Sequence, residues 1–167
     1  MRGSAKNFHL IDDQLGEVGP KAKFQTNIAA IKLLKYLEKT TGQATTEQQE
    51  VLSRYVGWGG LADAFDQNKT SWAAEYSELK ELLTPEEYAA ARSSTLNAHY
   101  TSPTVIRAIY DAVNRMGFES GTILEPSCGV GNFFGMLPES RSDRKPVSYT
   151  PLTLPTTCSC LIWVWPW

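Results

Sequence analysis

The chain has 167 residues, of which 42% are hydrophobic and 20% are charged, and its formal net charge is −2. This length allows one domain with a sizeable core, and the composition is that of an ordinary soluble globular protein. No apolar run approaches the roughly 20 residues of a membrane span, and the charge gives no global reason to bind nucleic acid. Residues 1–16 contain no apolar signal region. The three cysteines lack the paired spacing of a zinc site or a disulfide framework, so we expect no metal and a cytoplasmic location.

Residues 1–19 form a polar lead-in. Phe8, Leu10 and Ile11 give this segment some apolar character, so we predict that it docks as an extended arm. We interpret His9 as a surface or packing residue and not as a ligand.

Residues 20–96 are predicted to form a helical unit with short connections. Regular apolar spacing indicates a first helix over about 20–40. Its lysines fall on the other side, where they form either a solvated face, which we favour, or a contact to a phosphate backbone. The apolar residues at the helical period are Phe24, Ile28, Ile31 and Leu34, and the lysines are Lys32, Lys35 and Lys39.

A second helix is predicted to start at Thr45 or Thr46 and to break at Gly57. Gln48 lies three residues after Thr45, which is the spacing of a capping box. The break contains Trp58 between glycines, and two interpretations of this tryptophan are open. Either it fills the core at a helix–helix corner, which we favour, or it is exposed and stacks on a base or a partner. The apolar side of this helix is expected to be Val51, Leu52, Tyr55 and Val56.

Two further helices complete the unit. A third fits residues 71–83, with one face made of Trp72, Tyr76, Leu79 and Leu83. A fourth runs from Pro85 to about Ser94. Thr84 is its expected cap, and Glu87 reaches back to the N–H of that cap.

Residues 97–140 open with a polar turn and an amphipathic helix. Ser102 is the expected cap of this helix, Pro103 its first residue, and Gly117 closes it. One stripe of the helix is apolar and consists of Val105, Ile106, Ile109, Ala112, Val113 and Met116.

The stretch Ile123–Phe134 carries the strongest functional signal. A short aliphatic run predicts a buried strand, Glu125 and Pro126 stop it, and the turn that follows has two glycines. Strand, tight glycine turn and helix is how a doubly wound sheet presents backbone N–H groups to a ligand, so we interpret the turn as a nucleotide-cofactor loop. No Gly-Lys-Ser/Thr follows, which excludes an NTPase phosphate loop, and Phe134 replaces the third glycine of the dinucleotide pattern.

Two motifs together resemble the start of the S-adenosylmethionine-dependent DNA adenine-N6 methyltransferases. Residues 100–103, Tyr-Thr-Ser-Pro, match a Tyr-Thr-Pro-type turn of this family, with Ser102 as a departure, and residues 124–133 match its Asp/Glu-Pro glycine loop. Residues 52–61 and 96–103 are also similar to the large methylase–helicase proteins of bacterial conjugative elements and phages. The resemblance covers roughly residues 7–140. It implies a mostly α chain that ends in the first strand and glycine loop of a Rossmann-like α/β methyltransferase domain.

The resemblance also implies S-adenosylmethionine as the cofactor and DNA as the partner of the parent protein, with weak or absent cofactor binding in this fragment. The glycine loop would offer N–H donors, Glu125 would balance the ammonium or sulfonium, and Tyr100 and Thr101 would close over the methionine end. Cys128 is interpreted as a small filler without a nucleophilic role. The implied cofactor-binding residues are Tyr100, Thr101, Glu125, Pro126, Ser127, Gly129, Gly131, Asn132 and Phe133.

The motif with which this family handles the adenine amine, Asn/Asp-Pro-Pro-Tyr/Phe, does not occur in the sequence. We therefore assign no catalytic residue and expect an inactive N-terminal fragment. Residues 141–167 are interpreted as a non-native, disordered tail, because residues 147–157 resemble translated sequencing-adapter DNA. The alternative function is a non-catalytic helical module, which binds DNA or a helicase partner through Trp58 and the lysines of the first helix.

Overall fold

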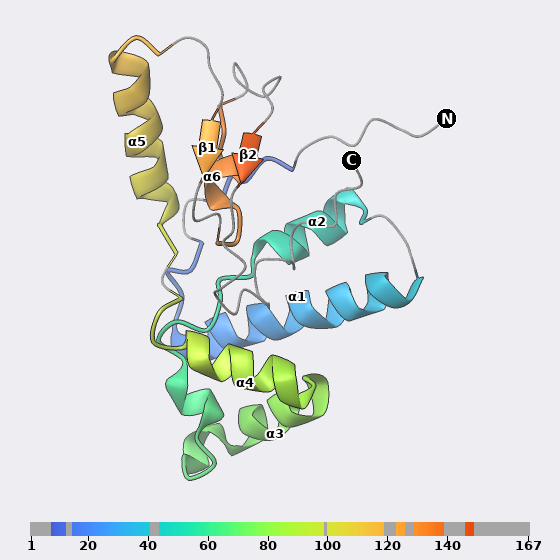
Figure 1. Cartoon of the computed structure of the whole chain (residues 1–167). Coiled ribbons are helices and arrows are strands. Elements are labelled where there is room, and N and C mark those ends of the chain that lie inside the picture. The colour runs from blue at the N-terminus through green and yellow to red at the C-terminus, as the bar shows by residue number, and fades with distance from the viewer. Residues whose placement is uncertain are drawn as a thin grey trace.

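The computed structural model describes residues 8–12, 15–40, 44–98, 100–118, 123–125, 129–138 and 146–148. This part of the chain is mostly helical (Figure 1), which confirms the mostly α prediction. The helices are α1 (Pro20–Thr40), α2 (Thr46–Ser53), α3 (Ala73–Leu82), α4 (Pro85–Ser94), α5 (Pro103–Arg115) and α6 (Asn132–Gly135), with the 3-10 turns η1 (Ala62–Phe65) and η2 (Thr70–Trp72).

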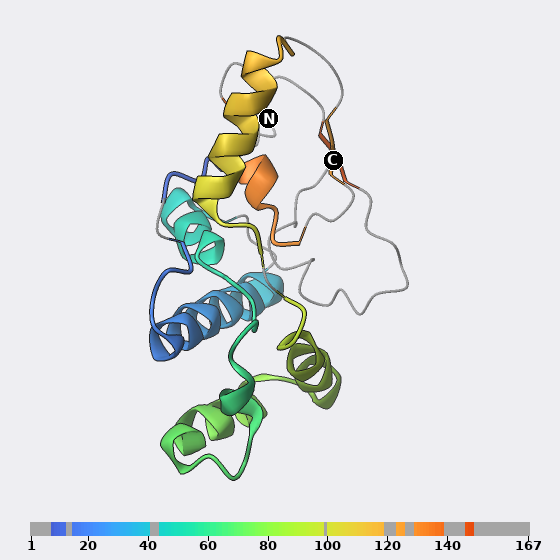
Figure 2. The ribbon, with the colours of Figure 1, turned by 90° about the vertical axis from the view of Figure 1, so that its left-hand side faces the viewer.

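Two three-residue strands, β1 (Ile123–Glu125) and β2 (Pro146–Ser148), pair in parallel, with Ile123 opposite Pro146. β2 belongs to the range that we interpret as a tail, and the rest of that range lies outside the described residues. Seen from the side in Figure 2, α5 and α6 lie next to each other above α1, whereas α3 and α4 lie below it.

The helix starts that the sequence predicts are confirmed at α1, α2 and α4. The side chain of Thr45 accepts a hydrogen bond from the N–H of Gln48, and the Gln48 side chain accepts one from the N–H of Thr45. Thr84 and Glu87 form the same capping box on α4, with Pro85 in the first turn. These caps depend on contacts three residues apart, which is why the sequence is sufficient to place them.

The predicted end of the second helix is wrong. α2 stops at Ser53, so Tyr55 and Val56 lie in the segment after it. Asn27 of α1 is responsible for part of this early stop. Its side chain is fully buried, accepts a hydrogen bond from the N–H of Val56 at 2.9 Å and donates one to the carbonyl of Gly57 at 2.7 Å. These bonds hold the backbone at Val56 and Gly57, where Gly57 has a left-handed φ of +72°, in a conformation that a continued helix would not allow.

Trp58 fills the main core. Its side chain is 1% exposed, and its ring meets the edges or faces of Phe24 and Phe65 at centroid distances of 6.1 and 5.3 Å. T-shaped aromatic pairs of this kind add to the free energy gained by burial. The core interpretation of Trp58 is therefore confirmed, and the exposed, base-stacking alternative is wrong for this residue.

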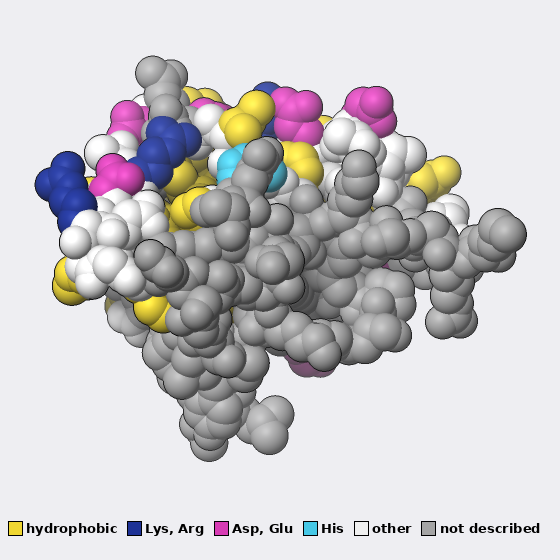
Figure 3. All heavy atoms as spheres, turned by 90° about the horizontal axis from the view of Figure 1, so that it is seen from above, with side chains coloured by type: hydrophobic (Ala, Val, Ile, Leu, Met, Phe, Trp, Pro, Cys, Tyr) yellow, Lys and Arg dark blue, Asp and Glu magenta, His cyan; other side chains and the backbone are white. Residues whose placement is uncertain are grey.

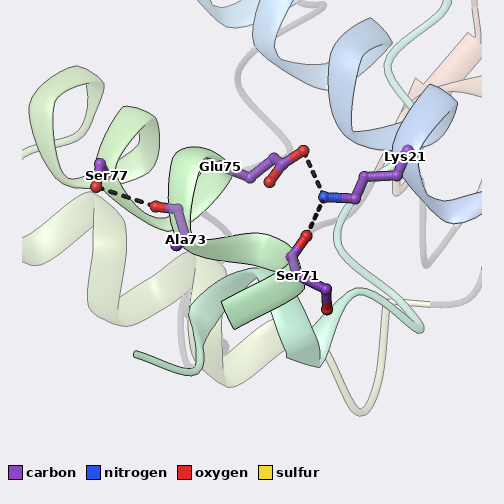
Figure 4. A network of polar contacts seen from close by, with 5 residues as sticks. All are labelled: Lys21, Ser71, Ala73, Glu75 and Ser77. Carbon is purple, nitrogen blue, oxygen red and sulfur yellow. Dashed lines mark hydrogen bonds and ion pairs between the residues drawn. The ribbon is translucent and has the colours of Figure 1, made fainter. Parts of the chain in front are cut away.

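Three lysines of α1 form ion pairs with residues of α3 and α4. Lys21 donates hydrogen bonds to the Glu75 carboxylate and to the carbonyl of Ser71, both at 2.6 Å, and so joins α1 to η2 and α3 (Figure 4). Two more pairs continue this row. Lys32 and Lys39 are exposed, which agrees with the favoured interpretation of a solvated face, and the phosphate contact stays a prediction. The ion pairs are Lys21–Glu75, Lys32–Glu78 and Lys35–Glu87, with distances of 2.6, 2.7 and 2.7 Å.

The Lys35–Glu87 pair predicts a pH dependence of stability. Partial burial raises the pKa of Glu87, but the hydrogen bonds from Lys35 and from the N–H of Thr84 outweigh it, so the pKa lies below its ordinary value of 4.5. A lowered folded-state pKa stabilises the fold above the pKa of the unfolded chain, and this contribution is lost as the pH falls through the folded-state value. We expect the free energy of unfolding to decrease below about pH 4.5, by less than about 1 kcal/mol from this pair because it is half exposed.

Urea unfolding of the wild type and of Glu87→Gln at neutral and acidic pH measures this contribution. Glu87→Gln is expected to show a smaller loss of stability on acidification than the wild type. Glu86→Gln is the matched control, because Glu86 is an exposed neighbour in the same helical turn and forms no ion pair within the described part of the chain. Equal pH slopes for the wild type and Glu87→Gln would contradict the role of the pair.

A second, smaller core lies between the arm, α5 and α6. Leu10 is 5% exposed and its N–H donates to the carbonyl of Gly135 at 2.6 Å. Leu15 is also buried there, so the prediction that the arm docks is confirmed for its described residues. Ile106 and Tyr110 supply the α5 side of this core.

The predicted apolar stripe of α5 is only partly buried. Ile106 is fully buried, whereas Val105, Ile109 and Met116 are 49, 41 and 76% exposed. Figure 3 views the molecule from the end at which α5 stops and shows hydrophobic side chains at the surface among charged ones. The periodicity correctly predicts an amphipathic helix, but α6 and the arm cover a narrower part of its circumference than the stripe. Ser102 precedes α5 as predicted, although its side chain makes no capping hydrogen bond.

Candidate functional site

Tyr100 connects the helical unit to the turn before α5. Its half-buried ring packs against the main core and directly over the backbone of Gly57. A Cβ atom added to Gly57 would lie 2.5 Å from Cε2 of Tyr100, a separation that side chains do not adopt. The absence of a side chain at Gly57 therefore leaves the space that the tyrosine ring occupies.

The glycine loop lies beside the turn that contains Tyr100 and Thr101. Gly131 has a φ of +83°, a left-handed conformation that glycine adopts readily, and it immediately precedes α6. Val130, between the two glycines, is 4% exposed and belongs to the main core. Asn132, the first residue of α6, donates a long hydrogen bond of 3.4 Å from its side chain to the carbonyl of Thr101. Two motifs that are separate in the sequence thus meet in space.

A pocket of about 180 Å³ lies where they meet. Three of the sequence-predicted residues line it: Tyr100, Thr101 and Asn132. The rest of the lining consists of Ser102, from the same turn as Tyr100 and Thr101, and of residues outside the turn and the glycine loop. These further residues are Leu15, Gly16, Glu17, Lys23, Val56, Gly59 and Ala98.

The other predicted site residues lie elsewhere. Glu125 is the last residue of β1, half-buried and outside the lining of this pocket. Phe133 packs in the second core at a ring distance of 6.3 Å from Tyr110, whose hydroxyl donates to the Phe133 carbonyl at 2.6 Å. Gly129 is half-buried in the turn. Pro126 and Ser127, as well as Cys128, lie outside the described residues.

The charged residues of the pocket could not be found from the motifs. Glu17 belongs to the lead-in and Lys23 to the first turn of α1, about 80 residues before the Tyr-Thr turn in the sequence. No sequence signal separates Lys23 from Lys21, which lies in the same turn of α1 and does not line the pocket. No signal marks Glu17 either.

A larger hollow of about 1000 Å³ lies elsewhere, between η1, α3 and α4. In it the ammonium of Lys80 lies 3.7 Å from the ring centroid of Tyr88 and contributes a cation–π contact to the packing of α3 on α4. None of the residues predicted from the two motifs lines this hollow.

No protein-family model, curated protein or solved structure matches the chain. Within the described residues, no group of three or more His, Cys, Asp or Glu side chains is arranged to hold a metal ion. None of the described helices has both the length and the apolar content required to cross a membrane.

Proposed function

We propose that the chain is the cofactor-binding opening of an S-adenosylmethionine-dependent DNA adenine-N6 methyltransferase domain with a Rossmann-like fold. On this proposal, α5 leads into β1 as the first strand of the sheet, and the turn before α6 is the cofactor loop. The single observation that carries the proposal is the approach of Asn132 to Thr101 beside one pocket. A cofactor site requires the two motifs to border one cavity, and their common lining of this pocket supports the proposal.

The residues of the pocket fit the methionine end of the cofactor. Thr101 and Tyr100 bring hydroxyl groups, Asn132 brings an amide, and the tyrosine ring suits a nearby sulfonium. The volume of about 180 Å³ is below the roughly 300–1,000 Å³ of pockets that enclose whole ligands of drug size. The pocket therefore matches one end of S-adenosylmethionine and not the entire molecule, and we expect weak binding.

Isothermal titration calorimetry with S-adenosylmethionine tests the proposal on the 167-residue chain. We expect a dissociation constant of roughly 0.1–1 mM, which corresponds to about −4 to −5.5 kcal/mol. Asn132→Ala is expected to weaken it several-fold, because it removes the contact that joins the two motifs. Asn68→Ala is the matched control, since Asn68 is an exposed asparagine in a turn and does not line this pocket. Absence of binding by the wild type, or equal affinities for the wild type and Asn132→Ala, would refute the cofactor assignment.

Methyl transfer to DNA is tested separately from cofactor binding. The sequence holds no Asn/Asp-Pro-Pro-Tyr/Phe motif, so the group that would handle the exocyclic amine of adenine is not among these 167 residues. We expect no transfer of labelled methyl groups from S-adenosylmethionine to DNA by this chain. Measurable transfer would show that the chain contains amine-handling residues that the motif does not describe.

A further inference from the structure

One short segment belongs to the main core and to the pocket beside the turn before α5 at the same time. This corner segment consists of residues 55–59, which follow α2. Tyr55 and Trp58 are each 1% exposed and lie in the main core. Val56 and Gly59, which alternate with them, line the pocket. The position of the corner segment therefore affects the shape of the pocket.

Asn27 of α1 binds the corner segment through both groups of its side-chain amide. The oxygen accepts a hydrogen bond from the N–H of Val56 at 2.9 Å, and the nitrogen donates one to the carbonyl of Gly57 at 2.7 Å. Asn27 is 0% exposed and does not itself line the pocket. Breaking either bond would leave a buried polar group unpaired, so the amide holds the two backbone groups in one arrangement.

Gly57 connects these hydrogen bonds to the wall of the pocket. Its backbone lies so close to the ring of Tyr100 that an added Cβ atom would be 2.5 Å from Cε2 of the ring. Tyr100 is one of the residues that line the pocket. Because the glycine and the ring are closely packed, a change in the backbone at Gly57 changes the support of the ring.

We infer that Asn27 is a positioning residue for the pocket, which acts through Val56 and Gly57 on the wall beside Tyr100 and touches no ligand itself. A buried side chain of α1 thereby couples the helical unit to binding at the turn before α5. This inference rests on the proposed function for the identity of the ligand, S-adenosylmethionine. The geometry rests only on the contacts of the three residues.

Fluorine nuclear magnetic resonance of protein labelled with 3-fluorotyrosine measures the surroundings of Tyr100 directly. The chain has 7 tyrosines, and Tyr100→Phe identifies the resonance of Tyr100 by its loss. Asn27→Leu keeps a side chain of similar size but makes neither hydrogen bond. We expect the Tyr100 resonance to shift and the hydrogen-exchange protection of the Val56 amide to fall. Titration of the same samples with S-adenosylmethionine should show an affinity about fivefold weaker than that of the wild type, an effect of the size of one lost hydrogen bond.

Two controls separate positioning from loss of stability. Leu79→Ala truncates another fully buried side chain of the main core, and Leu79 does not line the pocket. It should lower the midpoint of urea unfolding but leave the Tyr100 resonance and the affinity as in the wild type. Asn27→Asp keeps an oxygen that accepts from the N–H of Val56, so it should retain the exchange protection that Asn27→Leu loses.

Asn27→Ser is the milder variant if Asn27→Leu does not fold. A single short hydroxyl group cannot reach both backbone groups that the amide joins, so the Tyr100 resonance should shift in this variant as well. Far-UV circular dichroism of each variant verifies that the helical content is retained.

The inference and the proposed function fail in different ways. If S-adenosylmethionine binds the wild type and the Asn27 variants change neither the Tyr100 resonance nor the affinity, the positioning role is refuted and the cofactor assignment stands. If the wild type does not bind it while the Asn27 variants shift the resonance and Leu79→Ala does not, the cofactor assignment is refuted and the positioning role stands. An equal shift in Leu79→Ala would refute the positioning role, because any loss of core packing would then move the ring.

Discussion

Replacing Trp58 by alanine is expected to lower the free energy of unfolding by about 3–5 kcal/mol, the cost of truncating a large buried aromatic side chain. The ring is 1% exposed and lies between Phe24 of α1 and Phe65 of η1, so its removal leaves a cavity at the point where these elements meet. Domains of this size are stable by only about 5–15 kcal/mol, so a large part of the total stability depends on this side chain.

Urea unfolding followed by far-UV circular dichroism measures the effect without relying on tryptophan fluorescence. Tyr36→Ala is the matched control, because Tyr36 is an aromatic residue of α1 that is 59% exposed. It is expected to change stability by no more than about 0.5 kcal/mol. A loss below about 1 kcal/mol for Trp58→Ala would mean that the core does not depend on Trp58, contrary to its burial.

Replacing Gly57 by alanine is the second large effect. Gly57 has a φ of +72°, and a Cβ atom there would lie 2.5 Å from the ring of Tyr100. The left-handed conformation alone costs an L-residue about 1–2 kcal/mol, and the collision adds a cost of overpacking of about 1–3 kcal/mol. We expect a total loss of about 2–5 kcal/mol and displacement of Tyr100 from the wall of the pocket.

The chain supplies a control that separates these two costs. Gly60 has nearly the same φ, +75°, and no atom within 4 Å of a Cβ placed there. Gly60→Ala should therefore show the conformational cost alone. Adding Tyr100→Ala to Gly57→Ala should recover part of the stability, because the alanine removes the ring that the new Cβ meets. If Gly57→Ala and Gly60→Ala lost the same free energy of unfolding, the close approach of Tyr100 would make no contribution to the cost.

Local sequence signals predict the starts of the helices well. The capping boxes at Thr45 and Thr84 and the apolar period of α1 involve residues three or four positions apart, so each signal is contained within its own element. The end of α2 is different, because Asn27 of another helix binds the backbone at Val56 and Gly57. Nothing in the residues around Ser53 marks that stop.

The same distinction applies to the surfaces of the helices. The lysines of α1 are recognisable as a polar side, but their partners lie on α3 and α4, roughly 50 residues further along the chain. The stripe on α5 is recognisable as apolar, but the arm and α6 decide which part is buried. Periodicity identifies the amphipathic face, and only the neighbouring elements determine its extent.

For the candidate site, the sequence predicts the two motifs and their proximity, as the contact between Asn132 and Thr101 illustrates. It does not predict the wall formed by Glu17 and Lys23 or the role of Gly57 beneath Tyr100. These residues lie far from the motifs along the chain, and they contribute to the pocket only when the arm, α1 and the segment after α2 pack against the turn.

The docking of the arm also fixes an order of events during folding. Leu10 and Leu15 are synthesised roughly 90–130 residues before their partners Ile106, Met136 and Leu137. Contacts within α1–α4 span shorter stretches of chain, and such contacts form faster than distant ones. During synthesis at about 5–20 residues per second, several seconds pass between the synthesis of the helical unit and that of α6, and the helical unit can fold in this interval. We therefore expect the arm to close only after α5 and α6 have formed, so that the wall that carries Glu17 is completed late in folding.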